Sequence, residues 1–124
     1  MTLNNFYKNK KVLLTGDTGF KGSWLALWLT QMGAEVYGYA LPPDSDSANY
    51  SACKIGTLIN HVDGDIRDKE KFNEYILKIK PDIAFHLAAQ PLVIDSYSDP
   101  VYTYEVNVMG TIHFLEALQK YPVI

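Results

Sequence analysis

The residues of this chain best suited to chemistry form a glycine-rich segment, Thr15-Gly16-Asp17-Thr18-Gly19-Phe20-Lys21-Gly22. Gly16 allows a sharp turn, Gly19 leaves the backbone open to a phosphate group, and Gly22 allows the next helix to lie close to a sheet. The N-terminus of that helix would offer free N–H groups and the positive end of its dipole to a diphosphate. The Gly-Lys-Ser/Thr ending of a nucleoside-triphosphate loop is missing. The pattern therefore favours dinucleotide binding over a merely structural turn.

The residues after the second predicted strand indicate which dinucleotide would bind. An acidic side chain about 20 residues beyond the glycines normally accepts hydrogen bonds from the adenosine ribose. The expected position holds Ala40, while Asp44 and Asp46 stand a few residues later in a loop. These two carboxylates either substitute for it or are solvated loop acids. No arginine follows the strand to bind a 2′-phosphate, so the sequence favours NAD over NADP.

The elements that must position these residues alternate between two hydrophobic periods. Short apolar runs predict strands at 11–15, 35–40, 61–66 and 83–89. Apolar residues at helical spacing predict helices at 23–32, at 68–80 and from 99 onward. We expect Gly33 to end the first helix, and Asp68 and Asp99 to cap the other two.

This alternation of strands and helices predicts an α/β fold. It is a Rossmann-type doubly wound parallel sheet of about four strands, with helices on both faces. We expect residues 1–124 to form the N-terminal part of a dinucleotide-binding Rossmann domain, truncated before the fifth strand. The last residues, 122–124, would open that strand.

Composition excludes several other classes of protein. With 124 residues, 48% of them hydrophobic, the chain can build one core, and a formal charge of −3 argues against nucleic-acid binding. The single cysteine, Cys53, forms no internal disulfide, and no Cys/His cluster has metal-ligand spacing, so no metal site is predicted. The first eleven residues lack the apolar run of a signal peptide, and the apolar segment 24–29 is too short to cross a membrane. We expect a soluble, cytoplasmic protein.

The chain resembles the extended short-chain dehydrogenase/reductase family and, within it, is most similar to the CDP-glucose 4,6-dehydratases. The similarity follows the family's order through the segments 15–25, 38–41, 64–68, 85–93, 96–100 and 107–111. The glycine motif and Asp65-Ile66 are shared by the wider superfamily. The Gly19-Phe20-Lys21-Gly22 version and the segment Ala89-Gln90-Pro91-Leu92-Val93 indicate the dehydratase branch.

The resemblance implies a set of cofactor-binding residues: Gly16, Thr18, Gly19, Phe20, Lys21, Gly22, Asp65, Ile66, Leu87, Ala88, Ala89 and Gln90. Asp65 and Ile66 would hold the adenine, with the carboxylate accepting from the exocyclic amine, unless they only form a strand-end turn. The small residues Ala88 and Ala89, with Gln90, would line the crevice beside the nicotinamide, although core packing explains the two alanines equally well.

Other polar residues have weaker claims. Asn107 would order the active site, or it is an unremarkable polar residue on a helix face. Lys21 lies near the diphosphate or is a solvated surface lysine. We expect His86 to be a hydrogen-bonded core residue, His113 to lie on the outer side of the last helix, and His61 to have no identifiable partner.

Catalysis in the family that the chain resembles requires a Tyr-x-x-x-Lys pair after the fifth strand, in which the lysine lowers the pKa of the tyrosine. We therefore expect the catalytic residues downstream of Ile124. Two pairs have the same spacing, Tyr7 with Lys11 and Tyr50 with Lys54, but their positions before the first strand and in the adenosine-side loop indicate coincidence.

The resemblance implies a parent lyase that converts CDP-glucose to CDP-4-keto-6-deoxyglucose with NAD, for the deoxysugars of surface polysaccharide such as O-antigen. It also implies a homodimer formed through helices that include the last one. We expect the chain by itself to be inactive. The alternatives are a sugar epimerase or reductase of the same family, and a fragment that binds dinucleotide without chemistry.

Overall fold

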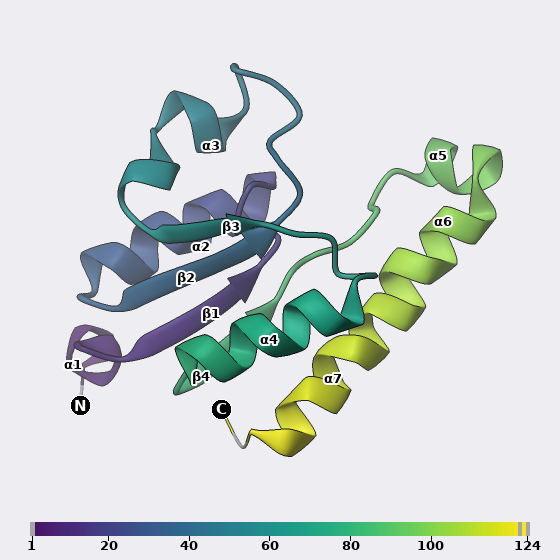
Figure 1. Ribbon diagram of the computed structural model, residues 1–124. Coiled ribbons are helices and arrows are strands. Elements are labelled where there is room, and N and C mark those ends of the chain that lie inside the picture. The colour runs from purple at the N-terminus through teal and green to yellow at the C-terminus, as the bar shows by residue number, and fades with distance from the viewer. Residues whose placement is uncertain (1, 122, 124) are drawn as a thin grey trace.

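The computed structural model describes residues 2–121 and 123. Within these residues, a single sheet of parallel strands forms the centre of the molecule (Figure 1). The strands are β1 (Lys11–Thr15), β2 (Glu35–Ala40), β3 (Asn60–Asp63) and β4 (Ile83–His86), in the spatial order β3-β2-β1-β4. From β1, the chain passes outward through β2 to β3 and then crosses to β4 on the other side of β1. This arrangement confirms the predicted Rossmann-type fold. In such sheets, ligands generally bind outside the carboxyl ends of the strands where the strand order reverses, which here is beside β1.

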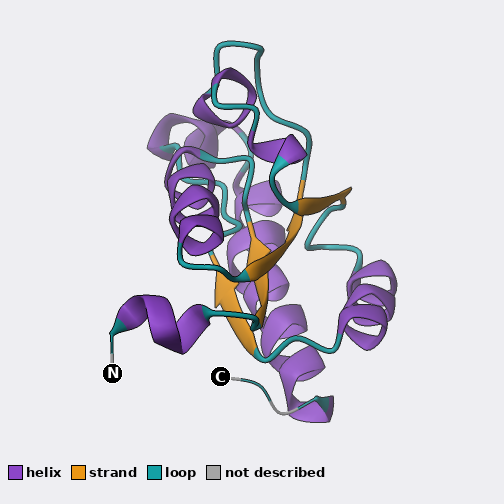
Figure 2. Cartoon of the chain, turned by 90° about the vertical axis from the view of Figure 1, so that its left-hand side faces the viewer, coloured by secondary structure: helices purple, strands orange, loops and turns teal. Residues whose placement is uncertain are grey.

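Helices flank the sheet on both sides (Figure 2). The face on which Val12 and Leu14 lie is covered by α2 (Phe20–Gln31), with the short α3 (Asn49–Ala52) and the 3-10 turn η1 (Ile55–Thr57) nearby. The opposite face is covered by α4 (Lys69–Ile79) and by a C-terminal run of α6 (Pro100–Tyr104), the π-helical turn η2 (Glu105–Met109) and α7 (Gly110–Lys120). Two short helices, α1 (Leu3–Tyr7) and α5 (Val93–Ser98), lie before β1 and after the β4 loop.

The apolar core is divided between the two faces because side chains alternate along each strand. In β1, Val12 and Leu14 pack toward α2, and Leu13 packs toward α4 and α7; all three are fully buried. On the α4 side, the ring of Phe72 stacks with that of Phe114 in α7 at a centroid distance of 6.0 Å. This packing fixes both helices against the sheet.

The predicted helix caps at Asp68 and Asp99 and the glycine after α2 are confirmed. The Asp68 side chain accepts a hydrogen bond from the backbone N–H of Lys71 at 3.1 Å, and the Asp99 side chain accepts one from Tyr102 at 3.0 Å. Each carboxylate satisfies an N–H that has no partner within its own helix. Gly33 follows α2 with φ at +82°, a conformation that glycine adopts without steric cost.

Several predicted boundaries are wrong, and those of the strands are wrong because of strand pairing. The last paired residues are Ala40 with Asp63 and Thr15 with His86. β3 and β4 therefore end earlier than the predicted 66 and 89, because β2 and β1 offer no further partners. The helix α2 begins at Phe20 and not at Ser23.

The C-terminal half also departs from expectation. The sequence pattern did not predict α5, and it predicted one regular helix where the structure has α6, η2 and α7. Two of the residues expected to open a further strand, Pro122 and Ile124, lie outside the described residues. Within the described part of the chain, no helix has the length and apolar character needed to cross a bilayer.

Candidate cofactor-binding site

The glycine-rich turn lies at the carboxyl end of β1, against the segment that leaves β4. Gly16 has φ at +77°, and its N–H donates to the carbonyl of Tyr39 at 3.0 Å. A Cβ atom added to Gly16 would stand 2.7 Å from the backbone nitrogen of Ala88 and the carbonyl carbon of Leu87. Only glycine can therefore occupy this position, both for its φ and for the close approach of the two backbones.

The second and third glycines differ in what surrounds them. A Cβ on Gly22 would overlap the carbonyl oxygen of Gly16 and lie 2.7 Å from its carbonyl carbon, so α2 packs directly on the turn. At Gly19 the nearest atom to an added Cβ is the same carbonyl oxygen at 3.3 Å, and no other atom lies within 4 Å. The backbone at Gly19 is thus open on its outer side, as a phosphate-binding position requires.

The first turn of α2 supplies donors for an anion. Its first regular backbone bond runs from the N–H of Ser23 to the carbonyl of Gly19 at 2.9 Å. The N–H groups of Phe20, Lys21 and Gly22 precede that bond and have no acceptor within the helix. Together with the open backbone at Gly19, they fit a diphosphate at the positive end of the helix dipole.

The turn is also tied to the loop after β2. The hydroxyl of Thr18 donates to the carbonyl of Leu41 at 2.7 Å. Ala40 ends β2 and is buried, while Asp44 and Asp46 are exposed in the following loop. Their part in ribose binding stays a prediction.

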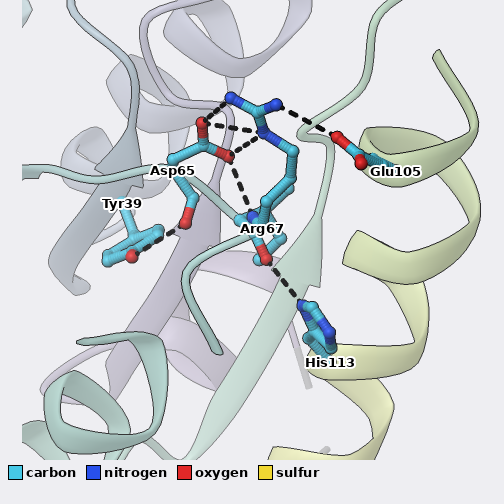
Figure 3. A network of polar contacts seen from close by, with 6 residues as sticks. Tyr39, Asp65, Arg67, Glu105 and His113 are labelled. Atoms are coloured by element: carbon cyan, nitrogen blue, oxygen red, sulfur yellow. Dashed lines mark hydrogen bonds and ion pairs between the residues drawn. The ribbon is translucent and has the colours of Figure 1, made fainter. Parts of the chain in front are cut away.

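Asp65 and Ile66 follow β3 in a loop and have different surroundings. Figure 3 shows Asp65 beside Arg67. The Asp65 carboxylate accepts from Nη2 of Arg67 at 2.7 Å and from the backbone N–H of Arg67 at 2.9 Å. Hydrogen bonds from Arg67 hold the pKa of Asp65 below its usual value, so this acceptor stays ionised. The Ile66 side chain is buried against Gly110, which leaves mainly its backbone to face a ligand.

Arg67 links this loop to the C-terminal helical run. Its Nη1 donates to the Glu105 carboxylate at 3.2 Å, and its guanidinium lies 4.7 Å from the centre of the Tyr102 ring. His113 of α7 donates from Nδ1 to the Ile66 carbonyl at 3.1 Å (Figure 3). The expectation that His113 lies on the outer side of its helix is therefore wrong, because α7 turns this residue toward the loop.

The segment after β4 is held by Thr15. The Thr15 hydroxyl oxygen accepts from the N–H groups of Leu87 at 3.1 Å and Ala88 at 3.2 Å. Its own proton is then available for Nδ1 of His86, 2.7 Å away. Burial lowers the pKa of His86, which agrees with a neutral ring that accepts at Nδ1. His86 is thus hydrogen-bonded, as predicted, but it is half-buried and does not lie fully in the core.

The neutral His86 ring continues this network into the C-terminal helices. Its Nε2–H donates to the Thr111 hydroxyl at 3.3 Å, which in turn donates to the carbonyl of Asn107 at 2.6 Å. The Asn107 side chain accepts from the N–H of Gln90 at 2.8 Å and donates to its carbonyl at 3.0 Å. Asn107 lies within the π-helical turn η2, a feature that often marks functional sites. The network therefore fixes the backbone at Gln90, beside half-buried Ala88 and exposed Ala89.

The two pairs with Tyr-x-x-x-Lys spacing are not suited to catalysis at this edge of the sheet, each for its own reason. Tyr7 belongs to α1, which precedes β1 and therefore lies toward the amino ends of the strands. Tyr50 is 8% exposed, and burial raises the pKa of its hydroxyl to about 12. A hydroxyl with so high a pKa is poorly suited to acid–base chemistry near neutral pH.

Sequence analysis missed three contributions to the site. The hydroxyl of Thr15 and the Asp17–His61 pair join residues far apart in the chain, and no short-range signal indicates them. His61 does have partners, contrary to expectation, in Asp17 and Asp63. Arg67 stands two residues after Asp65, and this charge pairing was visible in the sequence.

The fold and the open glycine turn define the class of protein as a Rossmann-type dinucleotide-binding domain. A family model described as GDP-mannose 4,6 dehydratase matches residues 13–123, and the chain belongs to this family. The resemblance to nucleotide-sugar dehydratases is thereby confirmed.

Individual relatives agree with this assignment. The chain is 51% identical to CDP-glucose 4,6-dehydratase of Salmonella typhimurium over 116 residues, which are 94% of this chain and 32% of that protein. It is 33% identical to GDP-mannose 4,6-dehydratase of Vibrio cholerae over 120 residues, 89% of this chain and 31% of the relative. This chain thus spans about a third of the length of the relatives that it matches.

A solved structure has the same fold. UDP-glucose-4-epimerase from Stenotrophomonas maltophila, with bound NAD and formylated UDP-arabinopyranose, superposes with a TM-score of 0.78 at 28% identity. The match covers 93% of this chain and 35% of the epimerase.

Proposed function

We propose that the chain is the NAD-binding N-terminal portion of a nucleotide-sugar dehydratase that converts CDP-glucose to CDP-4-keto-6-deoxyglucose. The observation that carries NAD binding is the open backbone at Gly19, next to three N–H groups of α2 without helical acceptors. The choice of CDP-glucose is supported by 51% identity to a CDP-glucose 4,6-dehydratase, against 33% to a GDP-mannose 4,6-dehydratase.

The residues of the chain would hold NAD in three places. The turn from Gly16 to Gly22 would bind the diphosphate through its N–H groups. Asp65, which Arg67 keeps ionised, would accept a hydrogen bond from the exocyclic amine of the adenine. Ala88, Ala89 and Gln90 would line the nicotinamide side, where Thr15 and Asn107 fix the backbone.

When bound, NAD supplies a group that takes up hydride from the hexose and returns it, so that the net reaction is the loss of water. The described residues would contribute binding and orientation, since they would hold the cofactor at the carboxyl edge of the sheet and fix the backbone beside it. The Tyr-x-x-x-Lys pair that moves the proton would come from another part of the protein. By itself, this chain would therefore be inactive.

Further properties follow from the same proposal. The protein would be a cytoplasmic lyase that supplies deoxysugars for surface polysaccharide. It would act as a homodimer formed through the C-terminal helical run, on which Val101, Tyr104 and Val108 are exposed.

A second candidate is a sugar epimerase, which is supported by the structural similarity to UDP-glucose-4-epimerase. Mass spectrometry separates the two functions, since a dehydratase removes one water from the sugar and an epimerase leaves its mass unchanged. The protein of natural length is incubated with CDP-glucose and NAD, and CDP-mannose serves as the control sugar nucleotide. A product of unchanged mass would contradict the dehydratase proposal.

A further inference from the structure

One charged residue of the glycine turn has no role in the proposed binding of NAD so far. Asp17 follows Gly16 directly, and its side chain is fully buried. Its carboxylate occupies the space beside Gly38 of β2, where an added Cβ would lie 2.7 Å from Asp17 Oδ1. Carboxylates are rarely buried without partners because the loss of hydration is costly. This buried charge therefore requires compensation.

The compensation comes from β3. Nδ1 of His61 lies 2.6 Å from Asp17 Oδ2, and Nε2 lies 2.8 Å from Asp63 Oδ1. A neutral imidazole has one N–H and can donate to only one of these carboxylates, whereas a protonated ring donates to both. The other oxygen of Asp17, Oδ1, has no hydrogen-bond partner within residues 2–121 and 123. In this part of the chain, His61 is thus the cation that neutralises Asp17.

The surroundings of His61 favour its protonated form. Burial lowers the pKa of His61, but hydrogen bonds and charge from Asp17 and Asp63 outweigh burial and raise it above 6.5. The Tyr50 ring lies 5.5 Å from the His61 ring, and Tyr75 approaches from α4 with its hydroxyl on the carbonyls of Gly38 and Asn60. Burial raises the pKa of both tyrosine hydroxyls, which therefore stay protonated and neutral beside His61.

We propose that protonated His61 is a positioning residue for the cofactor: it neutralises Asp17 within the diphosphate-binding turn, and loss of its proton weakens NAD binding. The inference rests on the proposed binding of NAD at Gly16–Gly22. With His61 neutral, an uncompensated carboxylate would lie in the same turn as the N–H groups that bind the diphosphate. Repulsion between this carboxylate and the diphosphate would oppose NAD binding. If Asp17 instead moved toward water, the turn would shift with it, and this shift would also weaken binding.

The test measures NAD affinity by isothermal titration calorimetry from pH 6 to pH 9, with the protein of natural length. For the wild type, we expect NAD affinity to fall about tenfold as His61 loses its proton. A tenfold fall corresponds to a His61 pKa that is about one unit higher in the NAD complex than in the free protein. His61→Gln should bind NAD weakly at every pH, because it leaves Asp17 charged and unbalanced. Adding Asp17→Asn should restore affinity and leave it independent of pH, which a purely structural role for His61 would not produce.

NMR titration of the His61 ring without NAD tests the pair independently of the cofactor. A pKa above 6.5 in the wild type that falls in Asp17→Asn supports the inference. An NAD affinity that stays constant across this pH range, or equal pH dependence in the double variant, would overturn it. If the wild type binds no NAD at any pH, the proposed function fails and the inference fails with it, even where the His61 pKa is raised.

Discussion

Alanine substitutions at Gly19 and Gly22 should separate cofactor binding from folding. At Gly19, φ and ψ are −73° and 170°, a backbone conformation that alanine adopts without strain, and its Cβ would make one tight contact, 3.3 Å from the Gly16 carbonyl oxygen. Alanine would gain roughly 0.4–1 kcal/mol from the reduced entropy of the unfolded chain and lose roughly 0.5–1 kcal/mol as a poorer N-cap. We expect the free energy of unfolding of Gly19→Ala to stay within about 1 kcal/mol of wild type. The added methyl group would fill the space of a phosphate, and NAD affinity should fall by at least about tenfold, or ~1.4 kcal/mol.

The matched change, Gly22→Ala, should act on stability. Its Cβ would overlap the Gly16 carbonyl and stand 3.0 Å from Cα of Asp17, so that relief requires a shift of the backbone. Overpacking costs roughly 1–3 kcal/mol where side chains can adjust, and we expect about 3 kcal/mol or more here. Urea denaturation and calorimetric titration with NAD measure the two effects. A Gly19→Ala protein that binds NAD like the wild type would refute the assignment of this turn to the diphosphate.

Three further predictions concern the scaffold and the network behind the site. Phe72→Ala removes a fully buried ring and should lower the free energy of unfolding by about 3–5 kcal/mol. Leu77→Ala, on the exposed side of the same helix, should lower it by about 0.5 kcal/mol or less. Similar losses for the two variants in urea denaturation would contradict the assigned faces of α4. Asp68→Ala should cost about 1 kcal/mol through loss of the α4 cap, and Asp68→Asn much less, by the same measurement. The pKa of His86 lies below 6.5 in the folded protein, so as pH falls the unfolded chain takes up a proton at this residue before the folded protein does. The stability due to neutral His86 should therefore be present above pH 6.5 and decline as pH falls. ¹⁵N NMR should show the Nε2–H tautomer at pH 7, and an Nδ1–H ring would contradict this assignment.

Features set by neighbouring residues in the chain were predictable. The glycine spacing, the caps at Asp68 and Asp99, and the αL glycine at position 33 each depend on a few adjacent residues. The alternation of buried strands with helices was sufficient for the parallel sheet, because parallel strands require crossover connections. The strand ends were not predictable in the same way, because Thr15 and Ala40 end the ladders of their neighbours.

The sequence by itself determined that this protein has a doubly wound fold and an open turn of glycines at the end of its first strand, since both follow from local backbone preferences and hydrophobic period. Only the tertiary structure decided which polar groups support that turn. Asp17 and His61 are 44 residues apart, and Thr15 and His86 are 71 residues apart. Their contacts exist because the order β3-β2-β1-β4 brings segments that are distant in the chain close together in space, and hydrogen bonds depend on distance in space and not on separation in the chain.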